Sequence, residues 1–159
     1  MGIRIRRGRR SDTEQLLGLV YALAKFERLD PPSAEGRKRL VDDIFRKKRV
    51  KLLVASDGGL LVGYALYFYN YSSFVAKPSL YLEDLFVLDG YRKRGIGFAL
   101  FRTCVDIAVT KGCGRMEWAV LTWNEKALKF YEKLGAKRMS DWYVCRLDEH
   151  ALKHVPREV

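Results

Sequence analysis

Apolar residues recur along this chain at two spacings, every second position in some stretches and every third or fourth position in others. Alternation and short apolar runs predict β-strands, whereas the longer spacing predicts amphipathic helices. The expected strands cover residues 2–7, 50–56, 60–69, 79–88, 115–121 and 137–147. The expected helices begin at residues 11, 33, 95 and 124 and end before residue 31 and at about residues 46, 110 and 135. This order predicts a mixed α/β fold in a single domain over residues 1–159.

Turn and capping residues mark the ends of several of these elements. Ser11-Asp12-Thr13-Glu14 matches a capping box. In this motif the Ser11 hydroxyl accepts a hydrogen bond from a backbone N–H of the first turn, and the Glu14 side chain accepts one from the Ser11 N–H. Asp57-Gly58-Gly59 predicts a β-hairpin between two strands. Asn124 and Asp148 are expected to cap a helix and a final helical turn.

Two adjacent carboxylates, Glu83 and Asp84, interrupt the otherwise apolar strand at residues 79–88. The strand has β-branched and aromatic character, so it is expected to be largely buried. Carboxylates are rarely buried without a partner or a function. Either a local pairing of the two groups or a binding site explains them.

The turn after this strand carries cations and glycines where a helix is expected to begin. Arg92, Lys93 and Arg94 precede Gly95 and Gly97. The first turn of a helix leaves about four backbone N–H groups without intrahelical partners, and the helix dipole favours an anion there. Glycines allow a phosphate to approach the backbone closely. The pattern indicates a site for a pyrophosphate, although an ordinary strand-to-helix turn with solvated cations has the same pattern.

Two familiar phosphate motifs do not fit this turn. A P-loop would need Gly-x-x-x-x-Gly-Lys-Ser/Thr, which the sequence lacks. A dinucleotide fingerprint would need a third glycine where the chain has Leu100. Glu117, which lies at the spacing expected for a ribose contact, falls inside a strand pattern.

Composition narrows the class of protein only in part. The chain has 159 residues, enough for one domain with a substantial core, and a formal net charge of +11. This charge is compatible with a polyanionic partner or with a soluble basic surface. The arginine-rich start has no apolar segment of the length found in secretory signals, and the longest apolar run, residues 60–69, is too short to span a membrane.

Cysteine and histidine residues give no sign of a disulfide framework or a metal site. Three cysteines form no C-x-x-C pair, which is typical of reduced thiols in a cytoplasmic protein. His150 and His154 are four residues apart, but no third ligand is evident nearby. We therefore expect no bound metal.

The basic turn and several other segments together resemble a known enzyme family. Residues 92–97 read Arg-Lys-Arg-Gly-Ile-Gly and match the pattern Gln/Arg-x-x-Gly-x-Gly/Ala. Further matches are Leu-Ala-Lys-Phe-Glu at 23–27, Tyr-Leu-Glu-Asp-Leu-Phe-Val at 81–87, Trp-Asn-Glu at 123–125, Phe130-Tyr131 and Gly135-Ala136. With the element order, these segments are similar to the GCN5-related N-acetyltransferases (GNAT), and in particular to their spermidine/spermine (diamine) N-acetyltransferase branch.

The resemblance implies a mostly antiparallel, splayed sheet flanked by helices, and acetyl-CoA as cosubstrate. In this family a strand backbone pairs with the pantetheine arm, here at Leu85, Phe86 and Val87. Backbone amides of the following turn hold the pyrophosphate, here those of Arg92, Lys93, Arg94, Gly95, Ile96 and Gly97. Asn124 would contact the same arm. Tyr131 would also lie at the cofactor and protonate the departing thiolate, a role that a phenol can fill.

The substrate side of the implied site is acidic. Glu83 matches the general base, which would remove a proton from the substrate ammonium directly or through water, since amines with a pKa near ~10 are mostly charged at neutral pH. Asp84 and Glu27 match positions that hold the remote cationic end, and Trp142 is a further expected substrate contact. Glu117 stands where diamine acetyltransferases carry a histidine, so the identity of the amine is not fixed by the resemblance.

These matches predict direct transfer of acetyl to a primary amine of a small polycationic substrate, either a polyamine, a diamine or a lysine-like amine. The resemblance also implies a cytoplasmic homodimer, with neither a membrane nor a nucleic acid as partner. Within the same enzyme class, the acceptor could instead be a protein lysine or N-terminus. A hypothesis of another class is a nucleic-acid-binding module that uses the basic N-terminus and the tyrosine-rich hairpin.

Overall fold

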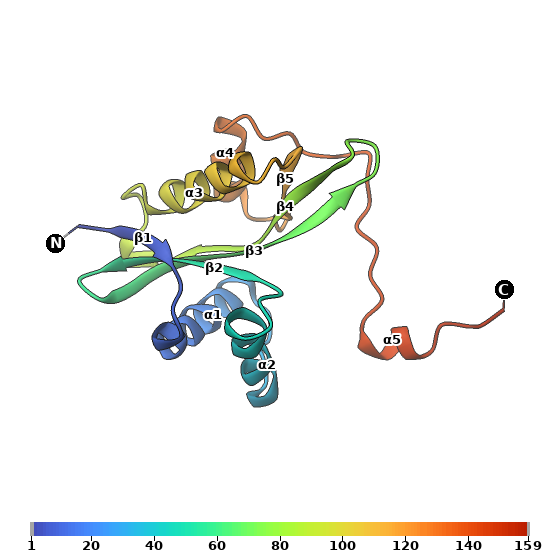
Figure 1. The fold of residues 1–159 in the computed structure, drawn as a ribbon, viewed down its shortest axis with the longest axis horizontal. Coiled ribbons are helices and arrows are strands. Elements are labelled where there is room, and N and C mark those ends of the chain that lie inside the picture. Colours follow the sequence, from blue (N-terminus) through green and yellow to red (C-terminus); the bar gives the residue numbers. More distant parts are fainter. Residues whose placement is uncertain (1, 159) are drawn as a thin grey trace. The chain divides into compact units, whose positions relative to one another are not determined.

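Five strands form one sheet in the order β1-β2-β3-β4-β5 in the computed structural model, which describes residues 2–158 (Figure 1). The strands are β1 (Arg4–Arg7), β2 (Lys51–Asp57), β3 (Leu60–Ser72), β4 (Lys77–Val87) and β5 (Arg115–Glu117). The first four pair antiparallel with their neighbours, and β5 pairs parallel to β4. The expectation of a mixed α/β fold with a mostly antiparallel sheet is confirmed.

The β2–β3 hairpin forms where the sequence predicts it. Gly58 and Gly59 have φ angles of 56° and 94°, which residues with a Cβ adopt rarely. The ladder between β4 and β5 is short and runs only from Ser79 opposite Arg115 to Tyr81 opposite Glu117. The expected strand at residues 115–121 is therefore shorter than predicted, because a strand extends only as far as its neighbour pairs with it.

Helices cover both faces of the sheet. Figure 1 shows α1 (Thr13–Glu27) and α2 (Ala34–Phe45) against one face and α3 (Ile96–Thr110) against the other. Short 3₁₀ turns precede α1 at Arg10–Asp12 and α3 at Asp89–Tyr91. The core on the α1 side is a cluster of buried apolar residues from both helices and three strands: Leu16, Leu19, Ile44, Leu52, Val54, Leu61, Tyr64, Leu66 and Phe86.

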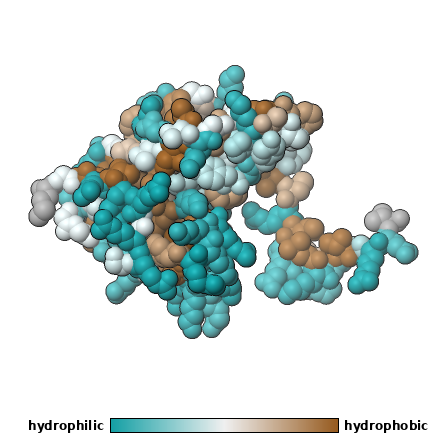
Figure 2. Space-filling view, in the orientation of Figure 1, coloured by the Kyte–Doolittle hydropathy of each residue, from teal (hydrophilic) through white to brown (hydrophobic). Residues whose placement is uncertain are grey.

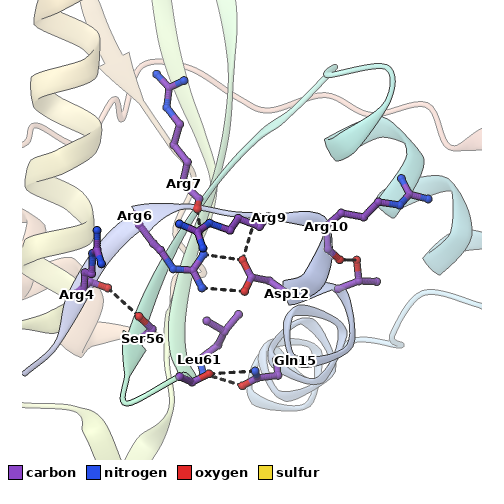
Figure 3. Close-up of polar contacts among 11 residues, drawn as sticks. Arg4, Arg6, Arg7, Arg9, Arg10, Asp12, Gln15, Ser56 and Leu61 are labelled. Carbon is purple, nitrogen blue, oxygen red and sulfur yellow. Dashed lines mark hydrogen bonds and ion pairs between the residues drawn. The ribbon is translucent and has the colours of Figure 1, made fainter. Parts of the chain in front are cut away.

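The start of α1 differs from the sequence prediction. Asp12 precedes the helix, and no side chain caps its first turn, so the capping box expected from Ser11 and Glu14 is wrong. The Asp12 carboxylate instead accepts two hydrogen bonds from the Arg6 guanidinium, at 2.7 and 2.8 Å, and one from the Arg9 backbone N–H at 2.7 Å (Figure 3). The Arg6 contact, more than any other group, lowers the pKa of Asp12. The ion pair between Arg6 and Asp12 joins β1 to the turn that leads into α1, and Asp12 is only 5% exposed.

A second polar contact ties α1 to the hairpin. Gln15 donates to the Gly59 carbonyl at 3.2 Å and accepts from the Leu61 N–H at 2.8 Å (Figure 3). One amide side chain thus satisfies both kinds of backbone group at the start of β3. The contact fixes the end of the hairpin against the helix that carries Glu27.

The cations of α2 and of the residues that follow it lie on a solvated face. Arg37, Lys38 and Arg39 are exposed, and Figure 2 shows hydrophilic residues gathered over this helix. Asp42 forms ion pairs with Arg46 and Lys47. Part of the positive charge is therefore neutralised locally, as expected for an ordinary solvated helix surface.

Residues Thr122–Val159 form a unit separate from Met1–Leu121. The second unit contains α4 (Glu125–Lys133) and α5 (Glu149–Lys153). Asn124 accepts from the Ala127 N–H at 3.2 Å, and Asp148 accepts from the Ala151 N–H at 2.7 Å, so both predicted N-caps are confirmed. The strand expected at residues 137–147 is wrong: this segment is irregular, because no neighbouring strand supplies hydrogen bonds to it within the described residues.

None of the helices within residues 2–158 combines the length and the apolar character that crossing a membrane requires. His150 and His154 stack with ring centroids 4.2 Å apart in α5 and its C-cap. The described part of the chain holds no group of three or more His, Cys, Asp or Glu side chains arranged to bind a metal ion.

Candidate active site

A β-bulge in β4 separates the two adjacent carboxylates. Asp84 lies opposite Leu66 and Leu82 lies opposite Tyr67, so Glu83 is an extra residue in β4. Bulges bend a strand and re-aim its side chains. Glu83 is exposed as a result, while Asp84 is half-buried. The pattern of the sequence flagged both carboxylates but gave no sign of the bulge that sends them to different environments.

The Asp84 carboxylate is held by a tyrosine of the neighbouring strand. The Tyr64 hydroxyl donates to Asp84 Oδ2 at 2.9 Å. Burial raises the pKa of Asp84 to about 6, the hydrogen bond from Tyr64 lowers it, and the charges of Glu83 and Glu27 raise it. Sequence reasoning did not identify Tyr64, because a tyrosine in an aromatic strand is most simply a core residue.

Glu27 completes a group of three carboxylates. It is the last residue of α1, where the helix dipole disfavours a negative charge. Burial raises its pKa, and the charge of Glu83 raises it further. Within residues 2–158, neither Glu27, Glu83 nor Asp84 has a lysine or arginine as an ion-pair partner. The structure therefore brings three predicted substrate residues together and leaves their negative charge without a protein cation.

This environment makes Asp84 a destabilising residue at neutral pH. We expect Asp84→Asn to raise the free energy of unfolding at pH 7.5 by about 3 kcal/mol, from a shift of roughly two pKa units. The pKa of Asp84 in the native state lies above the usual value of 3.8. Between about pH 4 and 6, Asp84 is therefore mostly protonated in the native state and mostly ionised in the unfolded chain. The stability of the wild-type protein therefore falls as the pH rises through this window, and the two proteins diverge there.

Urea unfolding at pH 4 and pH 7.5 measures this difference. Asp89→Asn is the matched control, because the Asp89 side chain is 94% exposed on the neighbouring turn. A stability gain for Asp84→Asn that is equal at both pH values would contradict the assigned environment of Asp84.

Arg92 stabilises the turn between β4 and α3 through its side chain. Its Nε donates to the Val87 carbonyl at 2.9 Å, and its Nη1 contacts Asp89 at 3.2 Å. The guanidinium also lies over the rings of Phe26, at 4.8 Å, and Phe86, at 5.6 Å. The Arg92 side chain thus connects the end of α1, the end of β4 and the turn. The sequence marked it only as one of three cations.

The rest of the turn presents backbone to solvent. Lys93 and Gly95 have φ angles of 62° and 76°, and both are exposed. Nothing lies within 4 Å of a Cβ added at Gly95, and a Cβ added at Gly97 would meet only Val87, at 3.9 Å. There is therefore open space beside both glycines at the start of α3, as a phosphate site at a helix N-terminus requires.

One edge of β4 is open next to this turn. Pairing with β5 stops at Tyr81, so residues 82–87 have no strand partner on that side within the described chain. Unpaired backbone groups of an edge strand can bind another extended, amide-containing chain. Leu85, Phe86 and Val87 lie on this open segment, and Arg92 to Gly97 follow it.

Three further residues that the sequence predicts for the site belong to the second unit. Asn124 uses its side-chain oxygen to cap α4. Tyr131 lies near the end of α4, with its ring 5.1 Å from that of Phe130. Trp142 is 75% exposed in the irregular segment. Their roles at the cofactor and the substrate stay predictions.

Comparison with known proteins agrees with this arrangement. The model of the acetyltransferase (GNAT) family matches residues 19–136. Thialysine N-epsilon-acetyltransferase of Mus musculus is 34% identical over 96% of this chain and 96% of its own length. L-ornithine N5-acetyltransferase NATA1 of Arabidopsis thaliana is 41% identical over 62% of this chain and 43% of its own length.

Solved structures give the same result for the fold. An integron cassette protein from the mobile metagenome of V. cholerae is 25% identical, with a TM-score of 0.80 over 96% of each chain. The family match begins within α1 and covers Glu27, the acidic bulge, the open edge of β4 and the turn before α3. The chain therefore belongs to the acetyltransferase (GNAT) family and is an N-acetyltransferase.

Proposed function

We propose that this enzyme transfers the acetyl group of acetyl-CoA to a primary amine of a small polycationic substrate, either a polyamine, a diamine or a lysine-like amine. The observation that carries the proposal is the group formed by Glu27, Glu83 and Asp84, which has no cationic partner in residues 2–158. A substrate with one or more ammonium groups would neutralise this charge. Among the relatives, those named for thialysine and L-ornithine act on side-chain amines of amino acids, which favours a substrate of this kind.

The open edge of β4 and the turn after it fit acetyl-CoA. The backbone at Leu85, Phe86 and Val87 lies on the part of β4 without a partner on the β5 side, where it would pair with the amide groups of the pantetheine arm, although the Val87 carbonyl already accepts from Arg92. The amides at the start of α3 would hold the pyrophosphate, and the exposed Lys93 and Arg94 would add attraction for it. Asn124, from the second unit, would contact the same arm.

The proposed reaction is a direct transfer in a ternary complex. Glu83, which is exposed and therefore open to substrate or water, would accept a proton from the substrate ammonium. The free amine nitrogen then forms a bond to the thioester carbonyl carbon, the C–S bond breaks, and the nitrogen loses its second proton to water as the amide forms. Tyr131 would give its proton to the sulfur that leaves and take up a proton from water afterwards. Asp84, Glu27 and Trp142 would hold the remainder of the substrate.

The cysteines of the first unit support transfer without an acyl-enzyme. Cys104 is buried, and burial raises its pKa to about 12. Burial also raises the pKa of Cys113. A thiol is a nucleophile only as its thiolate, so neither group suits covalent catalysis at neutral pH.

A panel of acceptors tests the proposal. We expect coenzyme A release from acetyl-CoA with one or more of spermidine, spermine, putrescine, thialysine, ornithine and lysine, and little release with a lysine-containing peptide. The physical reason is that Glu83 and Asp84 at the bulge, together with Glu27 at the end of α1, would compensate a compact set of ammonium charges. Turnover of the peptide alone would favour a protein acetyltransferase and contradict the proposed substrate class.

The homodimer, the cytoplasmic location and the single-domain organisation implied by the sequence belong to the same proposal. Light scattering of the purified protein measures the mass of the particle and tests the homodimer. Steep loss of binding to nucleic acid with added salt would support the alternative basic module instead.

A further inference from the structure

We propose that Tyr64 is a positioning residue for the amine substrate: its hydroxyl holds the carboxylate of Asp84 ionised and oriented to receive an ammonium group. This inference rests on the proposed function, because it assumes that Asp84 binds the amine. The hydrogen bond from Tyr64 to Asp84 is its structural basis.

Tyr64 is placed rigidly. Its side chain is completely buried, and it belongs to the core cluster on the α1 side of the sheet. It pairs in register with Phe86 across β3 and β4, with ring centroids 6.5 Å apart. Packing of this kind restricts a side chain to one rotamer. The Tyr64 hydroxyl is therefore already in place before a substrate binds.

The hydroxyl uses only one of the two Asp84 oxygens. Tyr64 donates to Oδ2, and within residues 2–158 no other side chain hydrogen-bonds to Asp84. A carboxylate can accept several hydrogen bonds, so Oδ1 remains for a further donor. An ammonium group has three donors and no acceptor, which matches that vacant capacity.

Tyr64 favours the ionised form of Asp84, whereas the other surroundings of Asp84 favour its protonated form. Burial raises the pKa of Asp84, and so do the negative charges of Glu83 on the same strand and Glu27 on α1. The Tyr64 hydroxyl lowers that pKa, which is about 6 in the intact protein. Without the hydroxyl, a larger fraction of Asp84 would be protonated near pH 7. A neutral carboxylic acid attracts an ammonium group weakly.

Tyr64→Phe removes the hydroxyl and keeps the ring. We expect the acidic limb of kcat/KM for the amine, plotted against pH, to move to higher pH in this variant. At pH 7 we expect kcat/KM to fall about tenfold, mainly through KM, because a hydrogen bond to a charged group is lost. The loss should shrink above pH 8, where Asp84 ionises without help.

Tyr67→Phe is the matched control. Tyr67 lies on the same strand and is also buried, with 4% of its surface exposed. Its surroundings are Tyr69, Cys104 and Arg7, not the three carboxylates. We expect this variant to lose a similar buried hydroxyl and to keep the pH profile of the wild-type enzyme.

Carbon NMR of protein labelled at the aspartate carboxyl carbons gives a readout that does not require turnover. The pKa of Asp84 should rise in Tyr64→Phe and stay unchanged in Tyr67→Phe, with Asp84→Asn identifying the resonance. An unchanged Asp84 titration, or equal pH profiles in an active wild type and Tyr64→Phe, overturns the inference alone. A wild-type enzyme that turns over no small amine overturns the proposed function, and the inference with it.

Discussion

Replacing Gly97 with glutamate is expected to abolish the binding of coenzyme A, with a loss of more than about 100-fold in affinity. Gly97 is the second residue of α3, and only Val87 lies within 4 Å of a Cβ added there. A carboxylate there would occupy the proposed phosphate site itself and repel the pyrophosphate. Each hydrogen bond to a charged group is worth about 1.5–3 kcal/mol, so losing two accounts for this magnitude.

The substitution should leave the fold intact. A Cβ at Gly97 would lie 3.9 Å from Val87, an ordinary contact, and glutamate suits the first turn of a helix better than glycine does. Gly18→Glu is the control, because Gly18 is an exposed glycine inside α1 with nothing within 4 Å of an added Cβ. Calorimetric titration with coenzyme A measures both variants, and thermal unfolding checks their stability. If Gly97→Glu bound coenzyme A with unchanged affinity, the pyrophosphate would not bind at this turn and the proposed phosphate site would be wrong.

Replacing Tyr131 with phenylalanine is expected to lower kcat by about 10²- to 10⁴-fold, the range that a general acid contributes. Negative charge develops on the sulfur as the C–S bond breaks, and the phenol proton would neutralise it. Phenylalanine keeps the ring that packs beside Phe130 at 5.1 Å. The affinity for coenzyme A should therefore stay close to that of the wild type.

Steady-state kinetics with the best amine of the panel, together with calorimetric titration of coenzyme A, separates the two quantities. Tyr143→Phe provides the control, because Tyr143 is 95% exposed in the same unit and should tolerate loss of its hydroxyl. If Tyr131→Phe instead lost coenzyme A affinity while kcat held, Tyr131 would be a binding residue and the acid would have to be sought elsewhere.

Local signals in the sequence determined most of the elements. The glycines of the hairpin, the two side-chain caps at Asn124 and Asp148, and the glycine turn before α3 all act within a few residues of chain. Turns and helix caps depend only on residues that are neighbours in the sequence, so they can be predicted without knowing the tertiary structure. The matching motifs of the family are local in the same sense, and they led to the site at residues 81–97.

Tertiary structure decided what those residues became. The bulge at Glu83, the bond between Tyr64 and Asp84, and the Arg92 guanidinium over two phenylalanine rings each join segments that are distant in the sequence or in different strands. The same dependence explains the two errors. Asp12 pairs with Arg6, so the Ser11 capping box does not form, and residues 137–147 have no neighbour in the described chain to make them a strand. Periodicity shows which residues can pair, but the partner is fixed only when the chain folds.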